Sequence, residues 1–300
     1  MSKAIDIEKS EKLPHDRRYL NISVLWIFYF RLAVRLFYRS RIPHEVVTLL
    51  SIISGLFSAW FLYNGALIIG ALLLHLKDIF DASDGALARL TGRGHLIGRY
   101  LDSLGDFVVL HAVVIAISLK AYSAGSHAYI FWGGLTLLSI FIQCSFFNFY
   151  QLAYVERYGI KTLSSKRDEI NRDDINRRID SVSWSYRMIL RGLRLFYIIV
   201  YSWQDKLVAS VDRAILRKVP PAHHDEYYGD KTFMTLQSPL CFGTHIFIII
   251  IFALIGRPEF SLIFISVVMN LYLLLLLYLR KSRFAAKSPT VLKPERFGVK

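Results

Sequence analysis

The chain has 300 residues, and 54% of them are hydrophobic. Its mean hydropathy of +0.38 is too high for a soluble protein of this size, so the composition indicates a membrane protein. Lysine and arginine outnumber aspartate and glutamate by 37 to 23, and this excess is expected in cytoplasmic segments rather than on a surface that binds nucleic acid. The two cysteines lie in apolar surroundings, which excludes a disulfide framework.

Residues 1–20 are polar and lack the short apolar region of a signal peptide, so we predict a mobile tail. In the next segment, 21–42, Arg31, Arg35 and Arg39 recur every four residues among aromatic and aliphatic side chains. This spacing places the arginines on one helical stripe and predicts an amphipathic helix in the lipid headgroup layer. The alternative is a solvated helix face packed on the rest of the protein.

Six stretches have the roughly 20 apolar residues that a transmembrane helix needs. They are 46–62, 66–88, 98–119, 129–155, 238–255 and 260–279. Three of the four short connections have only a few residues, so neighbouring spans form antiparallel hairpins. The predicted fold is an all-α integral membrane protein with six transmembrane helices in a bundle, an N-terminal interfacial helix and a long cytoplasmic segment between spans four and five.

We predict a single domain over 1–300. Spans one to four and the active site occupy 43–155, a basic cytoplasmic segment 156–237, the last two spans 238–280, and a basic tail 281–300. Within the cytoplasmic segment, Arg187, Arg191 and Arg194 form a second arginine stripe, for which we also predict an interfacial helix.

Nearly all basic residues fall on the side of the two termini, and only Lys120 and Arg257 fall on the other. The positive-inside rule therefore places both termini in the cytoplasm. We expect the protein in the cytoplasmic membrane of a prokaryote, with its active site on the cytoplasmic side.

The predicted spans contain Asp78 and four further carboxylates that form two pairs, although ionisable residues in a membrane are costly and by default mark a function. Asp81 and Asp84 end the second span, and Asp102 and Asp106 begin the third. Each pair shares a helix face, and the hairpin brings the two pairs together. The four charges would repel one another unless cations neutralise them, and oxygen ligands favour Mg²⁺ or Mn²⁺. Two such ions suit phosphoryl transfer. A divalent-cation transporter is an alternative of another class.

Small residues accompany these aspartates. Gly85, Ala88 and Gly98 leave room for a phosphate-bearing ligand to approach the backbone, although close helix packing also explains them. Arg89 is either a partner for phosphate groups or an interfacial anchor.

These residues match the pattern D-x2-D-G-x2-A-R-x8-G-x3-D-x3-D, in which the fixed positions are Asp81, Asp84, Gly85, Ala88, Arg89, Gly98, Asp102 and Asp106. The chain therefore resembles the CDP-alcohol phosphotransferase (CDP-alcohol phosphatidyltransferase) family. It departs from the family at Glu45, where an Asn is expected shortly before Thr48.

The resemblance implies an enzyme of phospholipid synthesis that transfers a substituted phosphate from a CDP-linked donor to an alcohol and releases CMP. It implies two Mg²⁺ or Mn²⁺ ions held by Asp81, Asp84, Asp102 and Asp106, with Asp106 a ligand or the catalytic base, and a CDP pocket lined by Gly85, Ala88, Arg89 and Gly98. CDP-diacylglycerol is the expected donor. The converse reaction, from CDP-choline or CDP-ethanolamine to diacylglycerol, is the alternative. Expected partners are the donor, the alcohol acceptor, membrane lipids and a second copy in a homodimer, and no nucleic acid.

Overall fold

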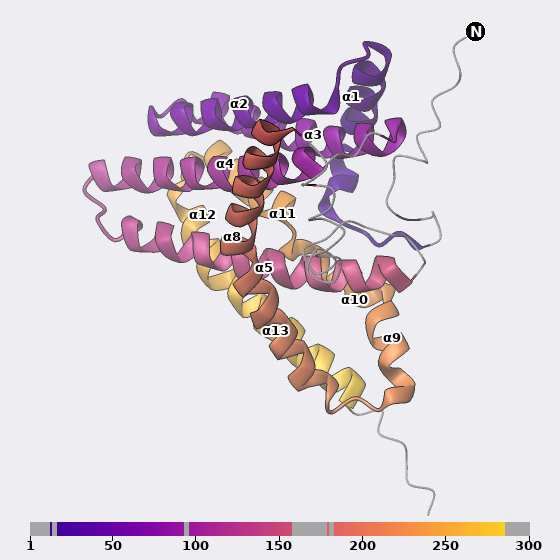
Figure 1. The fold of residues 1–300 in the computed structure, drawn as a ribbon. Coiled ribbons are helices and arrows are strands. Elements are labelled where there is room, and N and C mark those ends of the chain that lie inside the picture. Colours follow the sequence, from indigo (N-terminus) through magenta and orange to yellow (C-terminus); the bar gives the residue numbers. More distant parts are fainter. Residues whose placement is uncertain (1–12, 14–16, 93–95, 158–178, 180–182, 286–300) are drawn as a thin grey trace, which may run out of the picture.

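The computed structural model describes residues 13, 17–92, 96–157, 179 and 183–285, and within these residues it contains helices and no β-strand (Figure 1). The all-α class is therefore confirmed. Most of the predicted tail, residues 1–12 and 14–16, lies outside the described residues, as do 286–300. Tyr19, inside the predicted tail, packs its ring against Phe147 and Tyr154.

The first half of the chain forms the short 3₁₀ helix η3 (Ile22–Trp26), α1 (Ile27–Arg39), α2 (His44–Tyr63), α3 (Leu67–Thr91), α4 (Leu96–Ser123) and α5 (Tyr129–Arg157). The second half forms α8 (Trp184–Leu216), η4 (Pro221–His223), α9 (His224–Gly229), α10 (Lys231–Gln237), η5 (Ser238–Leu240), α11 (Phe242–Leu254), α12 (Glu259–Ile263), the π-helical turn η6 (Phe264–Val268) and α13 (Met269–Ala285).

Each predicted span falls on helical residues. By length and composition, four helical stretches can cross a membrane, namely His44–Tyr63, Tyr100–Ser123, Tyr129–Arg157 and Glu259–Phe284. A fifth is possible if Lys231–Leu240 and Phe242–Leu254, which meet at 47°, form one bent span. Helix α3 is not among them, because it carries four charged residues between Lys77 and Asp84. The count of six spans stays a prediction.

Helices α2, α3, α4 and α5 run alongside one another, and α1 lies across the ends of α2 and α3 (Figure 1). Helix α1 buries Val34, packs Phe37 against Val47 and Leu87, and exposes Phe28 and Leu32. Its amphipathic character agrees with the predicted interfacial helix, whose position in the headgroup layer stays a prediction.

Helix α8 is longer than the arginine stripe predicted within 156–237, and it packs across α4 and α5 (Figure 1). Its buried face consists of Leu190, Gln204, Val208, Asp212 and Ile215. Two of these residues are polar, and both form hydrogen bonds to α5. The described part of the segment, 183–237, is therefore packed on the bundle; residues 158–178 and 180–182 lie outside the described residues.

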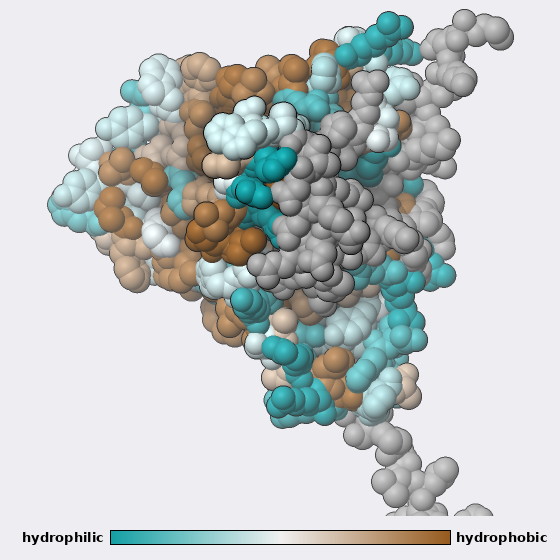
Figure 2. Space-filling view, viewed as in Figure 1, coloured by the Kyte–Doolittle hydropathy of each residue, from teal (hydrophilic) through white to brown (hydrophobic). Residues whose placement is uncertain are grey.

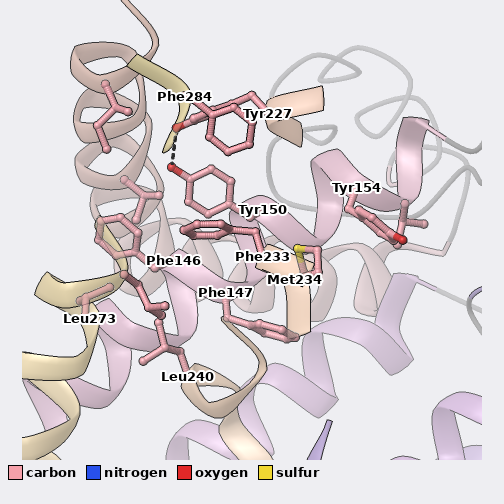
Figure 3. Close-up of a cluster of buried hydrophobic side chains, with 14 of the residues drawn as sticks. Phe146, Phe147, Tyr150, Tyr154, Tyr227, Phe233, Met234, Leu240, Leu273 and Phe284 are labelled. Atoms are coloured by element: carbon pink, nitrogen blue, oxygen red, sulfur yellow. Dashed lines mark hydrogen bonds between the residues drawn. The ribbon is translucent and has the colours of Figure 1, made fainter. Parts of the chain in front are cut away.

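The two largest apolar clusters join most of the helices. One joins α2, α3, α4, α5, α11 and α12. The other joins α5 to α8, α9, α10 and α13, and it contains Phe146, Tyr150, Tyr227 and Phe284 (Figure 3). On the face shown in Figure 2, hydrophobic residues gather over the level of α2 to α5. Hydrophilic residues gather at the lower end, where α9 and the end of α8 lie. The first cluster forms the framework on which the acidic residues are placed.

Candidate active site

Serines and glycines let α2 approach α3 and α4 closely. Ser51, Ser54 and Ser58 share one face of α2 and donate hydrogen bonds to the carbonyl oxygens of Lys77, Leu73 and Gly70 on α3, at 3.2, 2.7 and 2.7 Å. On α4, Gly105 lies against Ile52, since a Cβ atom at this glycine would be 2.6 Å from two carbon atoms of Ile52. The end of α3 and the start of α4 are thereby fixed beside α2.

This packing brings three of the four predicted aspartates together. One oxygen of each of Asp81, Asp102 and Asp106 lies within 4.8 Å of the others, and each residue is partly buried. Asp102 and Asp106 are one turn apart on α4, and Asp81 faces them from α3. The predicted juxtaposition of the two motif halves is therefore present in the structure.

Lys77 contributes a positive charge to this carboxylate group. Its Nζ atom donates a hydrogen bond to Asp106 Oδ1 and lies 3.4 Å from Asp81 Oδ1, while the side chain is only 1% exposed. Phe242 of α11 covers the ammonium group, with its ring centre 4.8 Å from Nζ. From the sequence, metal cations are expected to neutralise these charges, and the structure adds a lysine on α3, the helix that carries Asp81.

Asp84 is not one of these three carboxylates, although its charge interacts with theirs. Its Oδ2 atom accepts a hydrogen bond of 2.5 Å from Thr48 Oγ1, and Asp84 is buried. The same hydroxyl lies 3.1 Å from the carbonyl oxygen of His44, one turn earlier on α2. The group that the structure places close enough to share a cation therefore contains Asp81, Asp102 and Asp106, and α2 holds Asp84 beside it.

The predicted CDP-binding residues lie on the same helix ends. Gly85, Ala88 and Arg89 follow Asp84 on α3, and Gly98 is in the first turn of α4. Arg89 is exposed and lies near enough to Asp84 for their charges to interact. Gly98 is close to the side chain of His44, since a Cβ atom at Gly98 would be 3.3 Å from His44 Nε2. The structure thus places Gly98 against His44 of α2.

Sequence reasoning missed three residues near the acidic group. Lys77 is assigned no role from the sequence alone, although its position one turn before Asp81 is a usable signal. Thr48 was noticed only as part of the family pattern. Tyr201 of α8 donates a hydrogen bond of 3.1 Å to the carbonyl oxygen of Ser103 and interacts electrostatically with Asp102 and Asp106. No spacing in the sequence connects α8 with α4.

The donor set fits a hard divalent cation. Carboxylate oxygens are the ligands that Mg²⁺ prefers, and opposite ligands of an octahedral Mg²⁺ ion are about 4.2 Å apart. Three carboxylate oxygens within 4.8 Å of one another can therefore reach one ion after small side-chain rotations. Asp84, on the adjacent turn of α3, is the fourth carboxylate within the same motif.

Residues 42–163 match the family model described as CDP-alcohol phosphatidyltransferase, which covers α2 to α5 and the whole acidic group. The chain thus carries a CDP-alcohol phosphatidyltransferase domain, and the resemblance found in the motif is confirmed. Members of this family transfer phosphate-containing groups, so the protein is a transferase of phospholipid biosynthesis. Searches of curated proteins and of solved structures found no match.

Proposed function

We propose that the protein is a phosphatidyltransferase that uses CDP-diacylglycerol as donor and a small polar alcohol as acceptor, and that releases CMP. The observation that carries this proposal is the convergence of Asp81, Asp102 and Asp106 from two helices within the segment that matches the family. The proposed location is the cytoplasmic membrane of a prokaryote, with this site facing the cytoplasm, where nucleotide and lipid reach the same atoms.

In this proposal Asp81, Asp84, Asp102 and Asp106 hold two Mg²⁺ or Mn²⁺ ions. Such ions neutralise the pyrophosphate of the donor and the charge that develops on the departing CMP. Arg89 binds a phosphate oxygen of the donor, because this residue lies in the last turn of α3, near Asp84. Gly85, Ala88 and Gly98 line the space for the nucleotide.

The proton of the acceptor hydroxyl goes to a carboxylate oxygen of Asp106. The hydroxyl oxygen then forms a bond to the β-phosphorus of the donor, which carries the diacylglycerol, and the bond from this phosphorus to the bridging oxygen breaks, so that CMP leaves with the electron pair. Asp106 suits this role because it lies in the group with Asp81 and Asp102, beside the metal ions that this group would hold.

A direct test is CMP release by the purified protein with Mg²⁺ or Mn²⁺, in which CDP-diacylglycerol and CDP-choline are each offered with a panel of alcohols. We expect release from CDP-diacylglycerol with one acceptor. Release only from CDP-choline with diacylglycerol would reverse the roles of donor and acceptor. No release with any pair, together with divalent-cation flux in vesicles, would favour the transporter.

A further inference from the structure

Lys77 occupies an unusual place for a lysine. It lies in the middle of α3 with 1% of its side chain exposed, although a buried charge is stable only when it is paired. Its partners are Asp106 on α4 and Asp81 one turn further along α3. Phe242 of α11 closes the site on a third side. The lysine is therefore built into the acidic group by contacts with two other helices.

The oxygen atoms that Lys77 contacts belong to two of the three carboxylates that are close enough to share a cation. An ammonium group on these oxygens takes a position that a divalent ion bridging Asp81 and Asp106 would also need. Two positive groups at that spot would repel each other strongly, because Lys77 is buried there and water does little to screen the charges.

Asp78 offers the ammonium group a third partner, in addition to Asp106 and Asp81. It is the next residue on α3, it interacts with the charge of Lys77, and it forms a hydrogen bond with the side chain of Trp26. Its carboxylate lies near Gly243 at the start of α11, where a Cβ atom would be 3.4 Å from Asp78 Oδ1. A rotation of the flexible lysine side chain toward Asp78 would free Asp81 and Asp106 without leaving the ammonium unpaired.

We propose that Lys77 is the resident counter-ion of the acidic group and competes with the divalent ion for Asp81 and Asp106. Without metal, Lys77 holds the two helices together; when metal binds, the ammonium moves to Asp78. This inference rests on the metal site of the proposed function. It adds that Lys77 lowers the affinity of the wild-type protein for the divalent ion and stabilises the fold when no metal is bound.

The test measures Mn²⁺ binding to the purified full-length protein by electron paramagnetic resonance of free Mn²⁺, with no nucleotide or lipid substrate present. Lys77→Met removes the charge and keeps most of the side-chain volume. Lys120→Met is the matched control, because it removes the same charge at the exposed end of α4. Lys77→Gln repeats the test with a polar side chain if the methionine variant does not fold.

We expect Lys77→Met to bind Mn²⁺ about 10- to 100-fold more tightly than the wild type, a range typical of coupled sites. We also expect it to unfold at a lower temperature without metal and to regain stability when Mg²⁺ is added. Lys120→Met should change neither quantity. Equal or weaker Mn²⁺ binding by the Lys77 variants would overturn this inference and leave the proposed function standing. Failure of the wild type and all variants to bind Mn²⁺ would overturn both the competition and the metal site.

Discussion

At the scale of single residues, Asp106 combines two roles, since it contacts Lys77 and lies in the acidic group with Asp81 and Asp102. Replacing it by asparagine keeps the shape of the side chain but removes the negative charge and most of its basicity. We expect Asp106→Asn to lower CMP release by about 10²- to 10⁴-fold, the usual contribution of a positioned proton acceptor.

The activity of Asp106→Asn is compared with that of Asp225→Asn, which alters an exposed carboxylate on α9 that pairs with Arg157. Size-exclusion chromatography in detergent checks that both variants are folded. Activity above about a tenth of the wild type in the Asp106 variant would remove this residue from the role of base.

Substitution of Thr48 tests the role of Asp84. Its hydroxyl donates a hydrogen bond of 2.5 Å to Asp84 Oδ2 in buried surroundings, and leaving a buried polar group without a partner costs about 1–3 kcal/mol. In Thr48→Val, Asp84 is free to turn away from the site. We expect half-maximal CMP release to require about tenfold more Mg²⁺, since 1.4 kcal/mol corresponds to a factor of ten. Thr48→Ser, which keeps the hydroxyl, should resemble the wild type; an unchanged Mg²⁺ requirement in Thr48→Val would contradict this role.

The sequence was sufficient to find the aspartates, because charges in apolar spans stand out and the helical repeat fixes which of them share a face. It was not sufficient to assign Lys77 or Thr48. Whether a lysine one turn before an aspartate turns inward depends on the neighbouring helices, here α4 and α11. Thr48 meets Asp84 across 36 positions of sequence, a contact that only the packing of α2 on α3 creates.

At the scale of helices, the contact between α2 and α4 decides where Asp102 and Asp106 lie. Gly55 of α2 faces Val109 of α4, and a Cβ atom at Gly55 would be 2.8 Å from Val109 Cγ2 and 3.1 Å from Val109 Cβ. Valine has a stiff side chain, so the two helices would have to separate.

We therefore expect Gly55→Ala to destabilise the protein by about 1–3 kcal/mol, the usual cost of overpacking, and to reduce CMP release. Gly134→Ala on α5 is the matched control, because a Cβ atom at this glycine would have no neighbouring atom within 4 Å among the residues that the structure describes. Thermal unfolding in detergent compares the two. A Gly55 variant as stable and active as the Gly134 variant would show that the close approach is not needed.

Helix α8 is longer than the helix predicted from the sequence. The arginine stripe at Arg187, Arg191 and Arg194 predicted a helix, but the structure extends it to Leu216. Polar residues interrupt the apolar pattern there, and their partners lie far away in sequence: Gln204 accepts a hydrogen bond from Ser145, and Asp212 accepts one from Tyr150. A polar residue with a distant partner looks like a solvated one when the sequence is considered alone.

At the scale of the whole molecule, a buried arginine ties the C-terminal helix to the rest. The Arg280 guanidinium of α13 lies 3.6 Å from the ring centre of Tyr150 and 4.3 Å from that of Tyr227. It also donates hydrogen bonds to the side chain of Gln237 and to the carbonyl oxygen of Tyr227. Figure 3 shows these two tyrosines in contact within the cluster that joins α5, α9 and α13.

Because a desolvated cation–π contact contributes about 2 kcal/mol or more, we expect Arg280→Met to lower the temperature of thermal unfolding by several degrees. CMP release per folded molecule should change little, since Arg280 is not among the residues of the acidic group. Arg257→Met, at an exposed position between α11 and α12, serves as the control. Equal unfolding temperatures of the two variants would contradict a stabilising role for Arg280.

The number of membrane spans is also a property of the whole molecule, and the sequence predicts it less firmly than the positions of the helices. Hydropathy located helices at all six predicted spans. By length and composition, however, only four helical stretches can cross a membrane, or five if the bent pair Lys231–Leu240 and Phe242–Leu254 forms one span. The charges of α3 exclude this helix from the count, and the pair meets at 47°. A helix that carries a charged active site is less apolar than an ordinary span, so hydropathy is weakest where the function lies.

The measurement that tests the central claim most directly is Mg²⁺-dependent formation of CMP from CDP-diacylglycerol by the purified protein, with the lipid product identified by mass spectrometry. The account predicts equal amounts of CMP and of one new phospholipid, both lost when the metal is chelated. Persistent absence of both products, with every acceptor in the panel and with Mn²⁺ bound to the folded protein, would contradict it.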